Sequence, residues 1–462
     1  MVRNTGPTRP FGMMDRLGYM FGDFGNDFTF LLSSMFLMKF YTDVMDVAAG
    51  LVGAMMMLAR VVDAFTDVAM GQICDRSRPG KKGKFAPWLR RMCGPVALAS
   101  FLMYAVWFKN MPMGFKIFWM LFTYLLWGSI FYTSINIPYG SMASAITAEP
   151  NQRASLSSFR TVGATLASTV IGVVLPLVVY YEDANGNTVL SGEKMAAAAL
   201  ACSIGAVICY LLCYVMTTER VKMEKVTEKF SFKKLLKVLI GNRALIGIVV
   251  AALLLLLAQL TLSGMGNFIY PNYFGNREAM SVATMLSSLI TILLSTVIVR
   301  LASAYGKREL STMGALVGAG AMLLAFFLHT KNVWVFVGLY MAATLGFAFF
   351  NLLCWSMITD VIDDDEIRTG TRSDGTIYAV YSFARKLGQA ASAGLTGGLL
   401  SLAGYTAATA FDTSVVNGIY NITCLVPAAG FLLLALGLRF LYPLNKNTVE
   451  KNAQILKEKR GE

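Results

Sequence analysis

The sequence predicts an all-α membrane protein with twelve transmembrane helices in two six-helix halves. Three observations lead to this fold class. Of the 462 residues, 56% are hydrophobic and only 15% are charged, and the mean hydropathy is +0.58. Long apolar runs recur almost from end to end, whereas a soluble chain of this length would usually divide into two or three domains with separate cores. A long basic loop in the middle separates six of these runs from six others.

The apolar runs are located by averaging hydropathy over a window of about 19 residues. Each run is long enough to cross a hydrocarbon core of roughly 30 Å as a helix, and several are long enough to tilt or to extend beyond the bilayer. The predicted segments lie near residues 17 to 41, 47 to 73, 87 to 108, 114 to 145, 155 to 181, 196 to 216, 244 to 271, 279 to 302, 309 to 330, 332 to 361, 374 to 404 and 416 to 442.

The basic residues predict the orientation of these helices. The chain has 40 Lys and Arg residues and a formal net charge of +13, and most of the basic residues fall in the loops on the side of the two termini. An excess of Lys and Arg marks cytoplasmic loops, so we expect both termini in the cytoplasm and no nucleic-acid partner. The opposite side has only Lys109, Lys116, Lys194, Arg277 and Lys331.

The chain divides at its longest predicted cytoplasmic loop, residues 217 to 243. We expect an N-terminal six-helix half at 1–216, a C-terminal half at 244–445 and a short cytoplasmic tail at 446–462. A weak internal echo supports the division, because "GQICDRSRPGKKGK" follows the second segment and "VRLASAYGKREL" follows the eighth. Two such halves describe the major facilitator architecture, with a substrate site between them near the middle of the membrane.

Several classes of function are disfavoured by what the sequence lacks. The seven cysteines lie in or beside apolar segments without a CxxC pair, so we interpret them as small buried hydrophobic residues. There is no HExxH, Walker, GxSxG or Cys/His motif, and we therefore expect neither an enzyme nor a cofactor. The first residues lack a short apolar core with a cleavage site, so a removable signal peptide is not expected.

Two carboxylates in the second segment are the most informative charges. Asp63 and Asp67 occur in "ARVVDAFTDVAMGQ", and a spacing of four places them on one face of a helix, about 6 Å apart. Two such groups repel each other unless a cation lies between them or a proton neutralises one of them. We interpret them as a coupling-ion site. The alternative is a structural salt bridge with Arg60, three residues before Asp63.

A second set of membrane charges comes from three other segments. Asp27, Arg160 and Lys386 could grip sugar hydroxyl groups by charge-assisted hydrogen bonds, or they could simply balance one another. The polar stretches "GDFGNDFTF" and "FYTSINIPYG" favour a water-filled cavity. Charges near helix ends, such as Lys39 and Asp360, are better explained by snorkelling or capping.

Four stretches carry a resemblance to a known family. They are "MKFYTDV", "ARVVDAFTDVAMGQICDRSRPGKKGKFAPW", "INIPYGSMASAI" and "YSFARKLGQ". Together they resemble the glycoside-pentoside-hexuronide:cation symporters, which include melibiose, glucuronide and xyloside carriers, over about residues 15 to 445. The resemblance implies that Asp63, Asp67, Thr66 and Thr133 bind the coupling ion, which is Na⁺, H⁺ or Li⁺ in this family. Because Thr66 stands where melibiose carriers have asparagine, the choice of ion stays open.

The resemblance also implies a sugar site. Asp27, Arg160 and Lys386 match the residues of the first, fifth and eleventh helices that bind sugar in melibiose carriers. On the fourth helix, the sugar-binding aspartate of those carriers is replaced by Asn136, and we also place Tyr132 of this helix in the site. The stretch after the second segment resembles the gating loop of the superfamily, and we assign that role to Asp75, Arg76 and Lys82.

Further departures from the melibiose carriers concern the sugar. Asn26 replaces a lysine, Gly140 replaces a tryptophan, and Arg385 adds a cation beside Lys386. Together with the missing carboxylate at Asn136, this pattern suits an anionic uronide. A neutral xyloside or other glycoside is the open alternative.

These observations predict a secondary transporter of the cytoplasmic (inner) membrane. We expect symport of a glycoside or glycosyl uronide with a cation by alternating access, with the lipid bilayer as surroundings and a monomer as the functional unit. One alternative is a lysolipid symporter of the same superfamily, because vertebrate lipid carriers share the ion motif. The other is a membrane sugar sensor that binds without transport.

Overall fold

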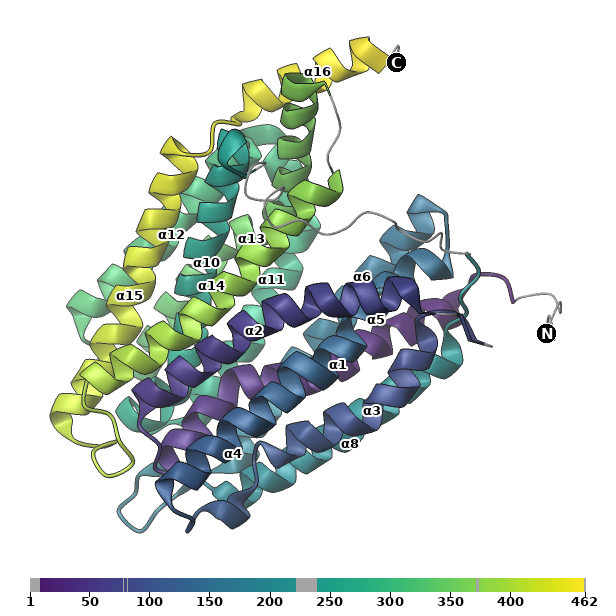
Figure 1. Cartoon of the computed structure of the whole chain (residues 1–462). Helices are drawn as coiled ribbons and strands as arrows, with labels where there is room; N and C mark the ends of the chain where they lie inside the picture. The colour runs from purple at the N-terminus through teal and green to yellow at the C-terminus, as the bar shows by residue number, and fades with distance from the viewer. Residues whose placement is uncertain (1–8, 78, 81, 222–238, 371–373, 461–462) are drawn as a thin grey trace. The chain divides into compact units, whose positions relative to one another are not determined.

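The computed structural model of the chain describes residues 9–77, 79–80, 82–221, 239–370 and 374–460 (Figure 1). These residues are helical apart from connecting loops and one hairpin, formed by β1 (Tyr180–Glu182) and β2 (Thr188–Leu190). The chain divides into two compact units. The first comprises Met1–Val47, Ala59–Tyr181 and Leu190–Lys229, and the second comprises Ala48–Leu58, Glu182–Val189 and Phe230–Glu462.

The first unit is a helical bundle in which α1 packs against α6 and α8, while α3 packs against α8 and α5 (Figure 1). Two of its helices are interrupted by wider π-helical turns, η2 and η3. The elements are α1 (Met13–Asp43), α2 (Ala49–Arg76), α3 (Ala86–Leu102), η1 (Val106–Phe108), α4 (Met113–Leu125), η2 (Leu126–Tyr132), α5 (Thr133–Ile146), α6 (Pro150–Thr169), η3 (Val170–Val174), α7 (Leu175–Val179) and α8 (Gly192–Met216). The first turns of α2 belong to the second unit.

The second unit is also helical, with α12 packed against α13 and α15, and α10 packed against α14 and α15. Its elements are α10 (Arg243–Phe268), η4 (Ile269–Tyr273), α11 (Arg277–Tyr305), α12 (Lys307–Leu328), α13 (Val333–Thr369), α14 (Asp374–Leu402), α15 (Thr413–Phe440) and α16 (Lys446–Arg460).

Polar caps define where several of these helices begin. The side chains of Ser191, Asn242, Asn276 and Asn332 precede α8, α10, α11 and α13 and accept hydrogen bonds from the first backbone N–H groups of those helices. These N–H groups have no partner inside the helix, so a cap removes the cost of leaving them unpaired.

Ten spans among the described residues are long and apolar enough to cross a membrane. The helices α1 and α14 are 31 and 29 residues long and fall outside these ten. α1 carries ionisable residues at Asp23, Asp27 and Lys39, which lower its hydropathy. The protein is therefore a multi-pass, all-α membrane protein, as predicted, while the count of twelve crossings stays a prediction.

Close helix contacts at glycine fix how α1 and α6 lie against each other. A Cβ atom on Gly163 of α6 would overlap the carbonyl oxygen of Met20 in α1. Small residues let membrane helices approach at this distance, where packing and weak polar contacts hold them together. The contact lies one turn from Arg160, so it sets the height at which that arginine meets α1.

The last helix, α16, was expected only as a short tail. Its Asn452 amide donates a hydrogen bond to Asp364 of α13, and Leu456 is buried. The hairpin of β1 and β2 was not predicted either, because strands of three residues are too short to show an alternating pattern.

Two helix-end charges differ from expectation. Lys39 does not snorkel, since it is only 1% exposed and forms an ion pair with Asp43 at 2.8 Å. Asp360 forms an ion pair with Lys307, whose Nζ lies 2.7 Å and 2.8 Å from its two carboxylate oxygens. A buried charge needs such a partner, because water is not available to solvate it.

Candidate functional site

The two carboxylates of α2 face two hydroxyl groups of the helix formed by η2 and α5. Ser129 donates a hydrogen bond to Asp63, and Thr133 donates one to Asp67 Oδ1 at 2.7 Å. The two carboxylates are four residues apart, and so are the two hydroxyls, so one turn of α2 lies against one turn of its neighbour. The arrangement brings together two carboxylates and two hydroxyls, which are the oxygen donors that small hard cations prefer.

The π-helical turn η2 shapes this side of the site. Such turns are rare and occur frequently at functional sites. Gly128 lies within the turn, and a Cβ atom there would be 3.1 Å from both carboxylate oxygens of Asp63. The absence of a side chain therefore lets Asp63 approach the turn closely.

Arg60 supplies a positive charge beside Asp63. Its Nη1 lies 3.7 Å from Asp63 Oδ2. The guanidinium also lies over the rings of Phe30, Trp127 and Tyr124, with centroid distances of 4.8, 5.7 and 5.8 Å. Aromatic faces attract a cation, so these rings hold the arginine in place. The coupling-ion interpretation and the salt-bridge alternative are thus compatible for Asp63.

The hydroxyl of Thr66, which the resemblance assigns to the ion site, is hydrogen-bonded within its own helix. It donates to the backbone carbonyl of Asp63 at 3.2 Å. Ser129, which the sequence reasoning missed, takes the equivalent place beside Asp63. In the part of the chain that the structure describes, no group of three or more His, Cys, Asp and Glu residues could hold a metal ion.

Arg160 pairs with an aspartate one turn before the predicted one. Its Nε donates to Asp23 Oδ1 at 2.9 Å, and its guanidinium lies 5.5 Å from the ring centroid of Tyr139. The Tyr139 hydroxyl in turn donates to the Tyr19 carbonyl at 2.7 Å. Asp23 is therefore a functional candidate that the sequence reasoning did not assign. The signal was its spacing of four from Asp27, which places both on one face of α1.

Asp27 is half-buried, and no described residue donates a hydrogen bond to its carboxylate. It lies on the same face of α1 as the Asp23–Arg160 ion pair. An ionised carboxylate in a membrane helix requires water or a polar ligand. Its oxygens are thus available to accept hydrogen bonds from a bound molecule.

Two of the departures from melibiose carriers form a single contact. The Asn26 amide donates to Asn136 Oδ1 at 3.3 Å, and Tyr210 donates to Asn26 Oδ1 at 2.8 Å. The missing lysine and the missing aspartate therefore lie side by side as a neutral amide pair. The lost carboxylate is thus matched by a lost cation, and this contact adds no net charge to the first unit.

Tyr132 lies at the end of η2 and contacts the aromatic residues around Arg60. Its ring stacks on Phe30 with a centroid distance of 5.9 Å and lies 5.2 Å from that of Trp127. It thus connects the turn that carries Ser129 with α1.

The predicted cations of α14 belong to the second unit. The Arg385 guanidinium lies 5.7 Å and 5.8 Å from the ring centroids of Trp355 and Tyr381, and its Nη1 is 3.5 Å from the Tyr381 hydroxyl. Arg385 is therefore held against aromatic residues of its own unit. Lys386 follows it on α14, with its side chain half-buried.

The predicted gating residues lie where α2 ends. Arg76 is the last residue of α2, and its side chain is exposed. Lys82 follows in the loop, and its ammonium lies 4.5 Å from the ring centroid of Tyr214 in α8. The side chain of Asp75 lies outside the described part of the chain.

Known proteins resemble this chain over almost its whole length. A family model described as MFS/sugar transport protein matches residues 18–446. The glucuronide carrier protein homolog of Escherichia coli strain K12 is 30% identical over 93% of this chain and 92% of its own length. The isoprimeverose transporter of Lactiplantibacillus pentosus is 30% identical over 94% of this chain and 89% of its own length.

A solved structure is similar in fold. The crystal structure of a D-xylose-proton symporter superposes with a TM-score of 0.61 and 14% identity, covering 93% of this chain and 96% of that one. Together with the family match, this similarity confirms the predicted major facilitator fold.

Proposed function

We propose, from the premise that this chain belongs to the MFS/sugar transport protein family, that it moves a glycoside across the membrane together with one monovalent cation. Membership in this family makes the protein a transporter and not an enzyme.

The acid pair of α2 carries the proposal. Asp63 and Asp67 lie one turn apart on α2, so their carboxylates repel each other. A monovalent cation bound between them relieves this repulsion, which is costly inside a membrane. Two carboxylates and the hydroxyls of Ser129 and Thr133 favour Na⁺, which needs several oxygen ligands. A proton would need only one carboxylate, and Li⁺ would use the same oxygens as Na⁺.

The charges around Asp27 favour a neutral sugar. Asp23, Asp27 and Arg160 together have one net negative charge. The Asn26–Asn136 contact adds no charge. A sugar carboxylate would be repelled by this net charge, whereas sugar hydroxyls can donate hydrogen bonds to the oxygens of Asp27.

Coupling follows if ion and sugar stabilise the same conformation. Filling the site at Asp63 and Asp67 removes the repulsion between α2 carboxylates and prepares the unit for sugar, and by linkage the sugar raises the affinity for the ion by the same factor. Alternating access then moves both ligands together.

The test is uptake of labelled glycosides into proteoliposomes. We expect an inward Na⁺ gradient to drive accumulation, and Asp63→Asn to abolish accumulation while exchange of internal for external sugar continues. Accumulation driven only by a pH gradient would identify the proton as the coupling ion. A sugar sensor would show binding without accumulation, and a lysolipid carrier would move labelled lysolipid instead.

A further inference from the structure

The five residues that follow α8, Thr217–Val221, contact the ends of several helices of the first unit. The Thr217 hydroxyl donates to the Cys213 carbonyl at 2.6 Å and ends α8. The backbone N–H groups of Arg220 and Val221 both donate to the carbonyl of Ala145, near the end of α5, at 2.7 and 2.8 Å. This segment lies at the end of the first unit that the positive-inside rule predicts to be cytoplasmic.

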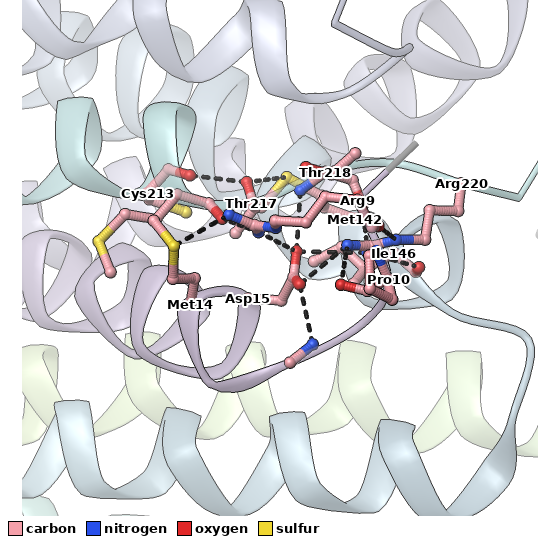
Figure 2. A network of polar contacts seen from close by, with 12 residues as sticks. Arg9, Pro10, Met14, Asp15, Met142, Ile146, Cys213, Thr217, Thr218 and Arg220 are labelled. Carbon is pink, nitrogen blue, oxygen red and sulfur yellow. Dashed lines mark hydrogen bonds and ion pairs between the residues drawn. The ribbon is translucent and has the colours of Figure 1, made fainter. Parts of the chain in front are cut away.

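Asp15 and Arg220 form the centre of this contact (Figure 2). Asp15 is fully buried at the start of α1, and Arg220 Nη2 lies 2.9 Å from its Oδ2. The same carboxylate accepts hydrogen bonds from the backbone N–H groups of Gly12 and Thr218 and pairs with Arg9 at 3.0 Å. A buried carboxylate that is saturated with donors fixes its partners in one geometry.

All three nitrogens of the Arg220 guanidinium donate hydrogen bonds to backbone carbonyls. Its Nε donates to the Arg9 carbonyl at 2.7 Å, and its Nη2 donates to the Pro10 carbonyl at 3.2 Å. Its Nη1 donates to the carbonyls of Thr218 and Ile146 at 2.8 and 3.3 Å. The backbone on both sides of residue 219 is therefore held to α1 and α5.

Glu219 lies between Thr218 and Arg220 in sequence, and its side chain contacts the start of α3. Its carboxylate accepts hydrogen bonds from three successive backbone N–H groups, those of Lys84 at 2.7 Å, Phe85 at 2.9 Å and Ala86 at 2.6 Å. Ala86 begins α3, so the negative charge satisfies donors that the helix leaves unpaired and meets the positive end of its dipole.

The loop before α3 is built to receive this carboxylate. Gly80 and Gly83 pair through their backbones, with hydrogen bonds of 2.7 and 3.3 Å. Gly83 has φ +116°, and a Cβ atom there would overlap the Glu219 carboxylate. Only glycine combines that backbone conformation with the space that the acid occupies.

We propose that Glu219 is a positioning residue for transport, which holds the loop before α3, residues 82–85, against the rest of the first unit. This loop lies between α3 and α2, the helix that carries Asp63 and Asp67. With the loop held, α3 and α8 move as one body at each transport step. Without Glu219, the loop relaxes between steps, so cation and sugar cross separately and accumulation falls.

The first test reads the hydrogen bonds themselves, by hydrogen–deuterium exchange of the purified full-length protein. In Glu219→Ala, the amides of residues 84 to 86 should exchange at least about tenfold faster, which corresponds to losing one charge-assisted hydrogen bond. Glu219→Gln should be intermediate, because its single amide oxygen can still accept from Phe85 and Ala86. If Glu219→Ala does not fold, the glutamine variant carries the test.

Glu149→Gln is the matched control. Glu149 is an exposed acid at the start of α6 whose side chain caps no backbone N–H group there. We expect exchange of residues 84 to 86 to be unchanged in this variant. Unchanged exchange in Glu219→Ala, or an equal change in Glu149→Gln, overturns the assignment.

The second test concerns transport and rests on the proposed function. Glu219→Ala should lower sugar accumulation, while exchange of internal for external sugar continues. Glu219→Gln should keep a thermal melting temperature near that of the parent. Faster amide exchange with unchanged accumulation would overturn the positioning role. If the parent protein accumulates no glycoside, the proposed function fails, and the amide exchange still decides whether Glu219 holds the loop.

Discussion

The close approach of Asp63 to η2 depends on Gly128, and adding one methyl group there should weaken the ion site. In Gly128→Ala, the new Cβ atom would lie 3.1 Å from both Asp63 carboxylate oxygens. That distance is a few tenths of an ångström too short for an unstrained contact, so the carboxylate or the helix must move. Binding constellations tolerate displacements of only about 0.5 Å.

The expected loss can be worked out from Coulomb's law. Moving the Asp63 carboxylate, whose single negative charge is shared by two oxygens, from about 2.4 to about 2.7 Å from Na⁺ at an effective dielectric constant of about 20 costs roughly 0.8 kcal/mol. Displacing only one of the two oxygens costs about half of that. We therefore expect the Kd for Na⁺ to rise about two- to fourfold.

The assay is calorimetric titration of NaCl into the purified protein, with Gly140→Ala as the matched control. Gly140 lies on the same helix, and a Cβ atom there would meet nothing within 4 Å. We expect the control to bind Na⁺ like the parent and to melt at or above the parent temperature, because alanine favours the helix and its Cβ atom meets nothing. An unchanged Kd in Gly128→Ala, or the same change in both variants, would refute the reasoning.

Three further predictions follow from the first unit. Asp27→Ala should lose sugar binding while calorimetry still detects Na⁺ binding, and unchanged sugar affinity would remove Asp27 from the site. Asn136→Asp should lower the melting temperature, because it puts a lone carboxylate beside a buried amide. Adding Asn26→Lys should restore at least half of the loss, and additive effects of the two substitutions on the melting temperature would contradict their coupling. In competition, a neutral glucoside should inhibit uptake about tenfold better than the matching glucuronide, because leaving the glucuronide's ionised group without a partner costs about 1.4 kcal/mol or more. Stronger inhibition by the glucuronide would reject the neutral sugar.

Periodicity explains how much of the ion site could be predicted. The spacing of Asp63 and Asp67 places both on one face of any helix, and the apolar surroundings mark them as costly charges. Ser129 carried the same signal, because it precedes Thr133 by four residues. It was missed because the family resemblance assigned a role only to Thr133.

The sugar side depended on tertiary contacts that the sequence does not encode locally. Asp23 and Asp27 share a face of α1, and periodicity cannot decide which of them meets Arg160. The choice follows from the height of α6 along α1, which the contact of Gly163 with Met20 fixes. Likewise, Asn26 and Asn136 were recognised as separate departures, and only the fold shows that they touch.

The helices were predictable because long apolar runs in a membrane protein leave the backbone no alternative to a helix. The contacts of Asp15 and Glu219 were not predictable, since each joins the start of a helix to the segment after α8, more than 130 positions away in sequence. Such segments show no periodic pattern from which a contact could be inferred.

The central claim is that one Na⁺ at Asp63 and Asp67 drives glycoside uptake, and the stoichiometry of coupled uptake tests it most directly. Proteoliposomes with an imposed Na⁺ gradient, and with the membrane potential held at zero, are allowed to reach steady state with labelled glycoside. One Na⁺ per sugar predicts that the sugar ratio rises to the Na⁺ ratio and no further, and that Asp67→Asn keeps it at unity. A sugar ratio that follows the square of the Na⁺ ratio, or one that ignores Na⁺ in the parent protein, would contradict the account.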